Sequence, residues 1–356
     1  MTSASFPSPE RPDVGYRAAH EAAVLVDHGA RGLLRLTGKT RLDLLHRMST
    51  QAVKDLKPGE GAATVLTTDI GRIIDRVILY ADADHTWLLA GDGHAEALTR
   101  YLRRNIFFND DVQVQDLSTA MAILGIYGPQ ARKYIVALGL DEGKELPLHH
   151  WASPGPRAPN IISFQTPITA ETAFTPALYS LHRADPLGGD GYIILTPADT
   201  VASLHHILAL MDGLSAIDEA TYDYLRIEAG QPRFGRELTL DYIPLEAGLW
   251  DDVSFHKGCY TGQEIIARME SRGKLARRLR GLRAAAPLTV GAEVRAFGAF
   301  SASGAGESVV GVVTSAVELP DLGPVALAVL RTAIEPGQSV VAGDVAATVV
   351  ELPFTV

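Results

Sequence analysis

A change of pattern near residue 279 constrains the fold more than any other feature of the sequence. Before it, stretches with strand character alternate with stretches of helical spacing and are joined by glycine turns. Beyond Leu279 the chain consists of short β-rich runs at 309–314, 324–330 and 340–352. Mixed elements with hairpin turns favour an α+β arrangement, and the closing runs predict a small terminal β-barrel. We therefore expect an α+β region over 1–278 and a barrel over 279–356.

Within the first region the spacing of apolar residues predicts individual elements. We expect a strand at 33–37, a helix at 41–56, strands at 62–68 and 73–80 around a turn at 69–71, and a helix at 95–104. Residues 152–160 hold three prolines and a glycine. This composition indicates a surface connection, so it marks an edge between two subdomains of 1–278.

Charged residues occur throughout the sequence and interrupt every long apolar stretch, so we expect no membrane-spanning segment. The longest uncharged stretch lies between Asp116 and Arg132, is broken by glycine and proline, and is too short to cross a bilayer. The first twenty residues carry four charges and lack the apolar core of a signal peptide. We therefore expect a cytoplasmic protein with no membrane partner.

Charge, cysteine content and motif spacing exclude several classes of function. The net charge of −10 argues against general nucleic-acid binding. The single cysteine, Cys259, rules out an intramolecular disulfide and the multi-cysteine sites of zinc and iron–sulfur proteins. The glycine before Gly38-Lys39-Thr40 lies too far upstream for a phosphate-binding loop. Adjacent histidines such as His149-His150 diverge and do not readily chelate one ion, so we expect no metal site.

The most informative motif is Lys257-Gly258-Cys259-Tyr260-Thr261-Gly262-Gln263-Glu264. Thr261 and Glu264 have the spacing of a capping box, which predicts a helix that starts at Thr261 just after Cys259. The positive end of such a helix, together with Lys257, would favour the thiolate form of Cys259. Cys259 and Lys257 are thus candidate catalytic residues. The alternative is an inert, buried cysteine, since free cysteine is usually a small core residue.

Two carboxylates are further candidates. Asp75 stands inside an otherwise apolar strand, where a buried charge is costly without a partner. It either contacts a ligand or pairs with a nearby arginine such as Arg72 or Arg76. Glu228 lies at the end of a predicted helix, which is unfavourable for a negative charge. Either Glu228 has a functional role, or its carboxylate is solvated or paired with a neighbouring arginine.

A basic segment follows the motif. Between Arg268 and Arg283 there are seven basic residues and one acid, Glu270. On an acidic protein this segment could attract a polyanion, such as the polyglutamate tail of a cofactor or a phosphate backbone. The commoner explanation is a solvated helix end and strand face. RNA is therefore the less favoured partner.

The motif from Lys257 to Glu264 resembles the K-G-C-Y-x-G-Q-E signature of the YgfZ-type folate-binding proteins, which are relatives of the glycine-cleavage T-protein. The resemblance continues over Leu34 to Tyr80, in Arg226-Ile227-Glu228-Ala229-Gly230 and in Leu245-Glu246-Ala247-Gly248-Leu249. It implies a T-protein-like folate-binding region followed by a barrel, with tetrahydrofolate as the cofactor. By motif position Asp75 would hold the pterin. Glu228 is one candidate for a second contact, and the glycine turn at Gly188 to Gly191, where relatives tend to carry an acid, is a rival location. Arg268 in the basic segment is a further cofactor-binding candidate.

The resemblance also implies a role. YgfZ-type proteins are implicated in assembly or repair of iron–sulfur proteins, so iron–sulfur client proteins are expected partners, with the thiol of Cys259 central. The T-protein family usually has two consecutive aspartates where this chain has Asp75-Arg76. That departure weighs against aminomethyl transfer, although a folate-dependent aminomethyltransferase stays as the alternative, with Asp75 as a catalytic residue. An RNA-modification factor is the second alternative.

Overall fold

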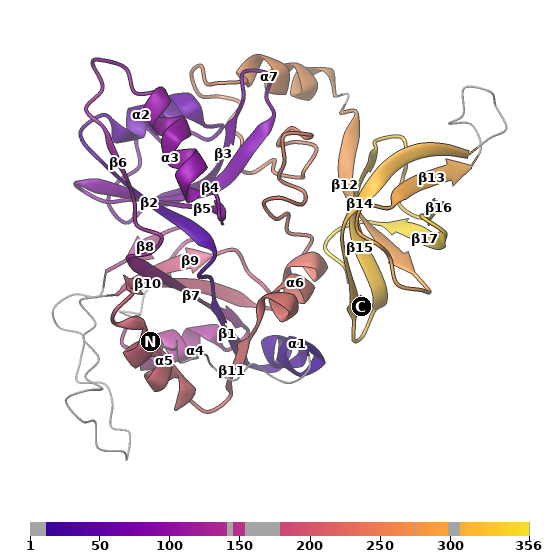
Figure 1. Ribbon diagram of the computed structural model, residues 1–356, viewed down its shortest axis with the longest axis horizontal. Coiled ribbons are helices and arrows are strands. Elements are labelled where there is room, and N and C mark those ends of the chain that lie inside the picture. The colour runs from indigo at the N-terminus through magenta and orange to yellow at the C-terminus, as the bar shows by residue number, and fades with distance from the viewer. Residues whose placement is uncertain (1–11, 141–144, 154–178, 274, 298–306, 356) are drawn as a thin grey trace. The chain divides into compact units, whose positions relative to one another are not determined.

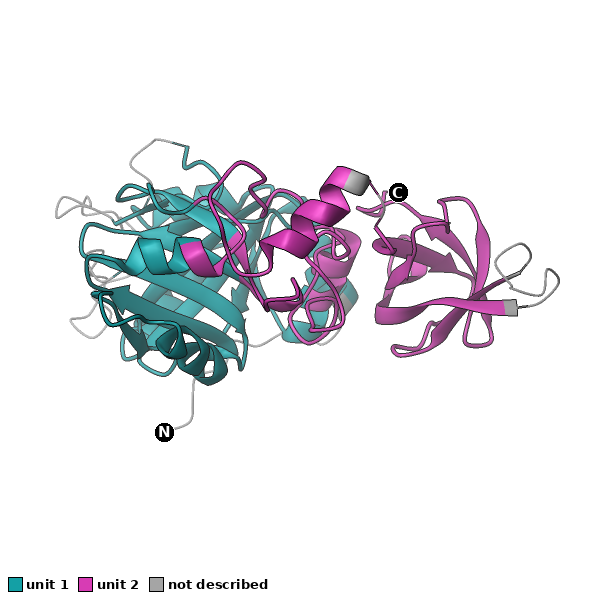
Figure 2. Ribbon diagram, turned by 90° about the horizontal axis from the view of Figure 1, so that it is seen from above, with its two compact units in different colours: residues 1–46, 53–63, 77–222 teal, residues 47–52, 64–76, 223–356 magenta. Residues whose placement is uncertain are grey.

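The computed structural model describes residues 12–140, 145–153, 179–273, 275–297 and 307–355. The chain divides into two compact units, which Figure 2 colours separately. The first unit holds 1–46, 53–63 and 77–222, and the second holds 47–52, 64–76 and 223–356. No helix among the described residues is long and apolar enough to span a membrane. Most of the predicted connection at 152–160 lies outside the described residues.

A six-stranded sheet forms the core of the first unit (Figure 1). Its strand order is β11 (Leu214–Ile217), β1 (Ala23–Asp27), β7 (Met121–Gly128), β10 (Asp190–Pro197), β9 (Ser180–Ala184) and β8 (Trp151–Ala152). Helices α4 (Ala131–Ala137) and α5 (Val201–Ala209) bury Tyr134 and Leu204 in one cluster with Ile126 of the sheet. Helix α1 (Pro12–Glu21) precedes β1. Burying these apolar faces supplies the main stabilisation of such a layer.

A second sheet contains the strand that carries Asp75. Its order is β3 (Gly61–Thr67), β4 (Ile73–Ala81), β5 (His85–Asp92), β2 (Arg31–Thr37) and β6 (Gln113–Asp116). Helices α2 (Arg41–Met48) and α3 (Ala95–Arg104) belong to the same region. The predicted strands at 33–37, 62–68 and 73–80 and the predicted helix at 95–104 are confirmed.

The predicted helix at 41–56 is wrong beyond Met48, where α2 ends. Ser49 forms an isolated bridge with Leu66, and the Thr50 amide donates to the carbonyl oxygen of Val65 at 3.0 Å. Backbone groups that pair with a strand cannot also form helical hydrogen bonds. The apolar spacing of Val53 and Leu56 reflects burial in a non-helical segment.

The second unit contains a closed barrel, so the predicted fold class, an α+β region followed by a small barrel, is confirmed (Figure 1). The barrel order is β12 (Arg277–Ala284), β15 (Gly323–Arg331), β14 (Glu307–Leu319), β13 (Glu293–Phe297), β16 (Ser339–Ala342) and β17 (Val345–Val350). Leu282, Val313 and Leu330 fill its interior. The domain boundary at 278/279 stays a prediction.

A buried ionic network links helix α6 (Glu219–Glu228) to the barrel inside the second unit. Arg226 donates to Glu237 at 3.2 Å and to the Ser315 hydroxyl at 2.8 Å, and that hydroxyl donates to Glu237 at 2.6 Å. The register of β14 shifts between Val313 and Ser315, and Ser315 is buried. Arg226 also pairs with Asp223 at 2.6 Å. Burial pushes the pKa of Asp223 up, but the charges of Arg226 and Arg233 outweigh it and hold that pKa below its usual value.

Removing one partner of this network should be costly. We expect Glu237→Ala to lower the free energy of unfolding by about 3 kcal/mol. The substitution breaks a buried ion pair and removes a carboxylate that balances the buried charge of Arg226. The measurement is urea denaturation followed by circular dichroism. Glu264→Ala is the control: it removes a surface pair with Arg268, for which we expect a loss below about 1 kcal/mol. Equal losses in the two variants would contradict the prediction.

Candidate functional site

Two glycines bring the sequence motif onto the turn between β3 and β4. Gly71 and Gly262 both have positive φ, at 74° and 82°. A Cβ on Gly262 would lie 2.5 Å from the carbonyl oxygen of Thr68 and 2.8 Å from the Cα of Gly71. Only glycine tolerates this conformation and this approach of two backbones. The motif therefore lies directly on the turn that leads into the strand of Asp75.

Asp75 is fully buried in β4, with 0% of its surface exposed. Consecutive strand residues point to opposite faces, so Asp75 and Arg76 project to different sides of the sheet. Arg76 pairs with Asp252 at 2.6 Å, while Arg72 donates to the carbonyl oxygen of Asp241 at 2.7 Å. Arg72 and Arg76 therefore both reach residues far along the chain, and the carboxylate of Asp75 is withdrawn from solvent.

Lys257 anchors the motif to the segment that follows α2. Its Nζ donates to the carbonyl oxygens of Ser49 and Gln51, both at 2.8 Å, and lies 5.0 Å from the ring centre of Tyr260. Burial lowers the pKa of Lys257 to about 7 and raises the pKa of Tyr260 to about 12. The ammonium therefore holds two backbone segments together in a partly desolvated place.

Cys259 lies on the surface next to this anchor. The alternative of a buried, inert cysteine is therefore wrong. The predicted capping box is also wrong: helix α7 (Gln263–Arg272) starts after Gly262, and the Thr261 hydroxyl donates to the Met48 sulfur at 3.8 Å. The left-handed conformation of Gly262 moves the helix start by one residue. Cys259 consequently lies one residue farther from the helix end than expected.

A hydrogen-bonded network surrounds Thr50. Its hydroxyl donates to the carbonyl oxygen of Asp252 at 2.6 Å and lies 3.4 Å from the Thr64 hydroxyl, and the Gln51 amide donates to Thr64 at 2.8 Å. Sequence reasoning missed Thr50 and Asp252. The pair Asp251-Asp252 ahead of the motif was the available signal for the acid, whereas nothing in the local sequence singled out Thr50.

The remaining predicted residues are held by other contacts. Glu228 is half-buried at the end of α6, where its carbonyl oxygen accepts from the Phe354 amide at 2.9 Å. Arg268 pairs with Glu264 one turn away on α7 at 2.6 Å, and both side chains are largely exposed. Asp75, Lys257 and Cys259 thus lie on segments that contact one another, namely β4 with its preceding turn and the motif. Arg268, in contrast, has the contacts of a surface residue.

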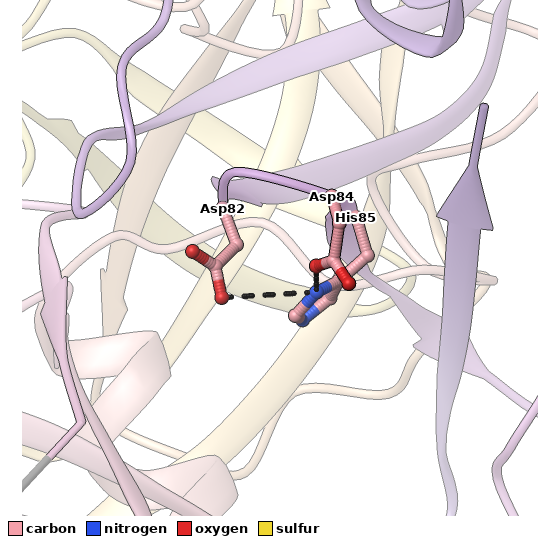
Figure 3. A group of neighbouring side chains, drawn as sticks. All are labelled: Asp82, Asp84 and His85. Carbon is pink, nitrogen blue, oxygen red and sulfur yellow. Dashed lines mark hydrogen bonds and ion pairs between the residues drawn. The ribbon is translucent and has the colours of Figure 1, made fainter. Parts of the chain in front are cut away.

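An acidic group in the first unit has the composition of a metal site. Ligand atoms of Asp82, Asp84 and His85 all lie within 4.8 Å of one another in the β4–β5 turn (Figure 3). His85 Nδ1 already contacts Asp84 at 2.7 Å, and this pairing is the main cause that lowers the pKa of Asp84. The group is accounted for as a hydrogen-bonded cluster within a hairpin turn.

Known proteins resemble this chain over most of its length. Residues 13–257 match the protein family described as the GCVT N-terminal domain. An aminomethyltransferase from Cutibacterium acnes is 29% identical over 359 residues, covering 95% of this chain and 89% of that protein. A chloroplastic protein from Arabidopsis thaliana that is named as a candidate transferase is 28% identical over 286 residues, or 79% of this chain, and the match spans 61% of that relative's own length.

A solved structure shares the fold. The glycine cleavage system aminomethyltransferase T from Bartonella henselae superposes with a TM-score of 0.81 at 24% identity. The superposition covers 98% of this chain and 91% of that one. The order of α+β region and barrel is therefore common to both proteins.

The lowered pKa of Lys257 predicts a pH-dependent contribution to stability. Below pH 7 the lysine is charged in both folded and unfolded chains, so the cost of burying the charge is fully present. As pH rises through about 7 toward the unfolded pKa of about 10.4, the unfolded chain binds the extra proton, so stability rises. We expect the free energy of unfolding of the native chain to rise relative to Lys257→Met between pH 6 and 9, measured by urea titrations. The exposed lysine in Lys57→Met is the control, and parallel curves for the native chain and Lys257→Met would contradict the prediction.

Proposed function

The chain belongs to the family of the GCVT N-terminal domain, and from this we propose that it is a tetrahydrofolate-binding accessory protein for iron–sulfur proteins. More narrowly, we propose that it is a YgfZ-type member of the family. The observation that carries the proposal is the fully buried carboxylate of Asp75 beside the Lys257-to-Glu264 motif.

The buried carboxylate suits a pterin. The aminopyrimidine edge of a pterin presents paired N–H donors, and an ionised carboxylate accepts two such bonds at once. Glu228 is the second proposed contact, because it lies in a family-like motif and is half-buried.

The exposed thiol supports the accessory role. Cys259 is open to solvent, as a thiol that reacts with or transiently binds a group on another protein must be. Lys257 lies two residues away in the sequence, and its hydrogen bonds to the carbonyl oxygens of Ser49 and Gln51 hold the loop that carries the thiol. Clients that carry iron–sulfur clusters would meet the protein at this loop.

Aminomethyl transfer is the second candidate, because relatives from several bacteria carry the name aminomethyltransferase. In this chain Arg76 occupies the position after Asp75 and pairs with Asp252. Where the T-protein family usually has a second aspartate, this chain therefore has an arginine that is already paired. Folate-dependent turnover of a protein-bound aminomethyl donor would favour this candidate over the accessory role.

Calorimetric titration with tetrahydrofolate tests the proposed site. We expect Asp75→Asn to weaken binding at least about tenfold, because the neutral amide replaces one acceptor with a donor and removes the charge. Glu228→Gln should weaken binding less, in keeping with its partial exposure. Asp251→Asn is the matched control: Asp251 is an exposed acid near the motif, and its substitution should leave the affinity unchanged. Native affinity in the Asp75→Asn and Glu228→Gln variants would refute the site.

Substitution of the thiol separates folate binding from the accessory role. Cys259→Ser should retain the native affinity for tetrahydrofolate, because the side chain is exposed and takes no part in the buried network. In cells that lack the native chain, the same variant should fail to restore the activity of iron–sulfur enzymes. Full restoration by Cys259→Ser would contradict the role of the thiol.

A further inference from the structure

Arginines that form no ion pair among the described residues lie at one end of the barrel. Arg277 of β12 and Arg331 of β15 are directly opposite each other in the strand register, and Arg278 follows on β12. All of these arginines are exposed, and none forms an ion pair with another residue in the described part of the chain. Like charges directly opposite each other on neighbouring strands destabilise a sheet. Their positive charge is therefore uncompensated within the described residues.

The rest of strand β12 shows the usual arrangement. Arg280 pairs with Glu351 at 2.7 Å, and Arg283 donates to the carbonyl oxygen of Thr355. Both of these residues are partly buried. The contrast is local, since Arg280 and Arg283 on the same strand each have a carboxylate or carbonyl partner. Uncompensated charge is confined to the end of the strand that bears Arg277.

This end of the barrel is connected to the strand of Asp75. The guanidinium of Arg277 lies over the ring of Tyr242, 5.9 Å from its centre, and Tyr242 is buried. The carbonyl oxygen of Tyr242 accepts from the amide of Ile73 at 3.0 Å, and Ile73 is two residues before Asp75 on β4. Stacking on an aromatic ring orients a guanidinium and leaves its N–H groups available.

We propose that Arg277 and Arg331 bind the carboxylates of a γ-linked oligoglutamate tail on reduced folate. The inference rests on the proposed function, since the tail would belong to a folate whose pterin is held at Asp75. Two neighbouring guanidinium groups match a chain of carboxylates, each of which accepts paired bonds from one arginine. A long RNA is the poorer fit, because the net charge of −10 repels a polyanion outside this small surface.

The test compares tetrahydrofolate monoglutamate with tetrahydrofolate pentaglutamate by calorimetry on the full-length protein. We expect the native chain to bind the pentaglutamate at least about tenfold more tightly at low salt, and this advantage should shrink with ionic strength. The double variant Arg277→Gln/Arg331→Gln should keep the native affinity for the monoglutamate and lose the advantage. Arg280→Gln is the control, because Arg280 already has Glu351 as a partner and should retain the advantage. Thermal unfolding by circular dichroism checks that each variant is folded.

The outcomes distinguish this inference from the proposed function. Equal affinity of the native chain for both folates would overturn the inference and leave the proposed function standing, and so would an advantage that persists in the double variant. Failure of both folates to bind would refute the proposed function, and the inference would fall with it. If an RNA oligonucleotide bound in a salt-dependent way, lost binding in the double variant, and the pentaglutamate advantage were absent, the arginines would be assigned to RNA instead.

Discussion

The candidate site depends on the contact between Gly71 and Gly262. Both residues have positive φ, and a Cβ on Gly262 would clash with the backbone of the β3–β4 turn. With no side chain between them, the two backbones approach closely enough for the motif to reach the segment after α2. Lys257 then binds the carbonyl oxygens of Ser49 and Gln51, and Cys259 is left on the outside. A larger residue at Gly262 would force the backbone of the turn to shift, and at Gly71 the positive φ alone disfavours a side chain.

Local patterns predicted the elements that depend on local forces. The strand at β2 and the helix at α3 follow from the spacing of apolar residues, and the barrel follows from short β-rich runs between turns. The errors occur where a distant segment intervenes. The helix beyond Met48 is replaced by pairing with β3, and the helix start at Thr261 is displaced by the contact of Gly262 with the β3–β4 turn. No window of neighbouring residues contains that information.

The same distinction holds for the charged residues. Asp75 could be identified from sequence because a carboxylate inside an apolar strand is conspicuous, and the structure buries it completely. Its neighbours Arg72 and Arg76 could not be assigned, because their partners come from residues 241 and 252, far along the chain. The network of Arg226, Glu237 and Ser315 was equally hidden, since Ser315 lies at a register shift of β14 that the local sequence does not mark. The partners in buried ion pairs are set by tertiary contacts, so they cannot be predicted from the spacing of residues in the sequence.

The burial of Lys257 determines which of its effects persists at neutral pH. Because burial lowers the pKa of Lys257 to about 7, a substantial fraction of the side chain is uncharged near neutral pH. Its two hydrogen bonds to backbone carbonyl oxygens, in contrast, need only N–H donors, which the neutral amine still provides. Lys257 therefore acts first as a positioning residue that fixes the loop. This positioning role persists as pH rises, whereas the positive charge of Lys257 is lost above neutrality.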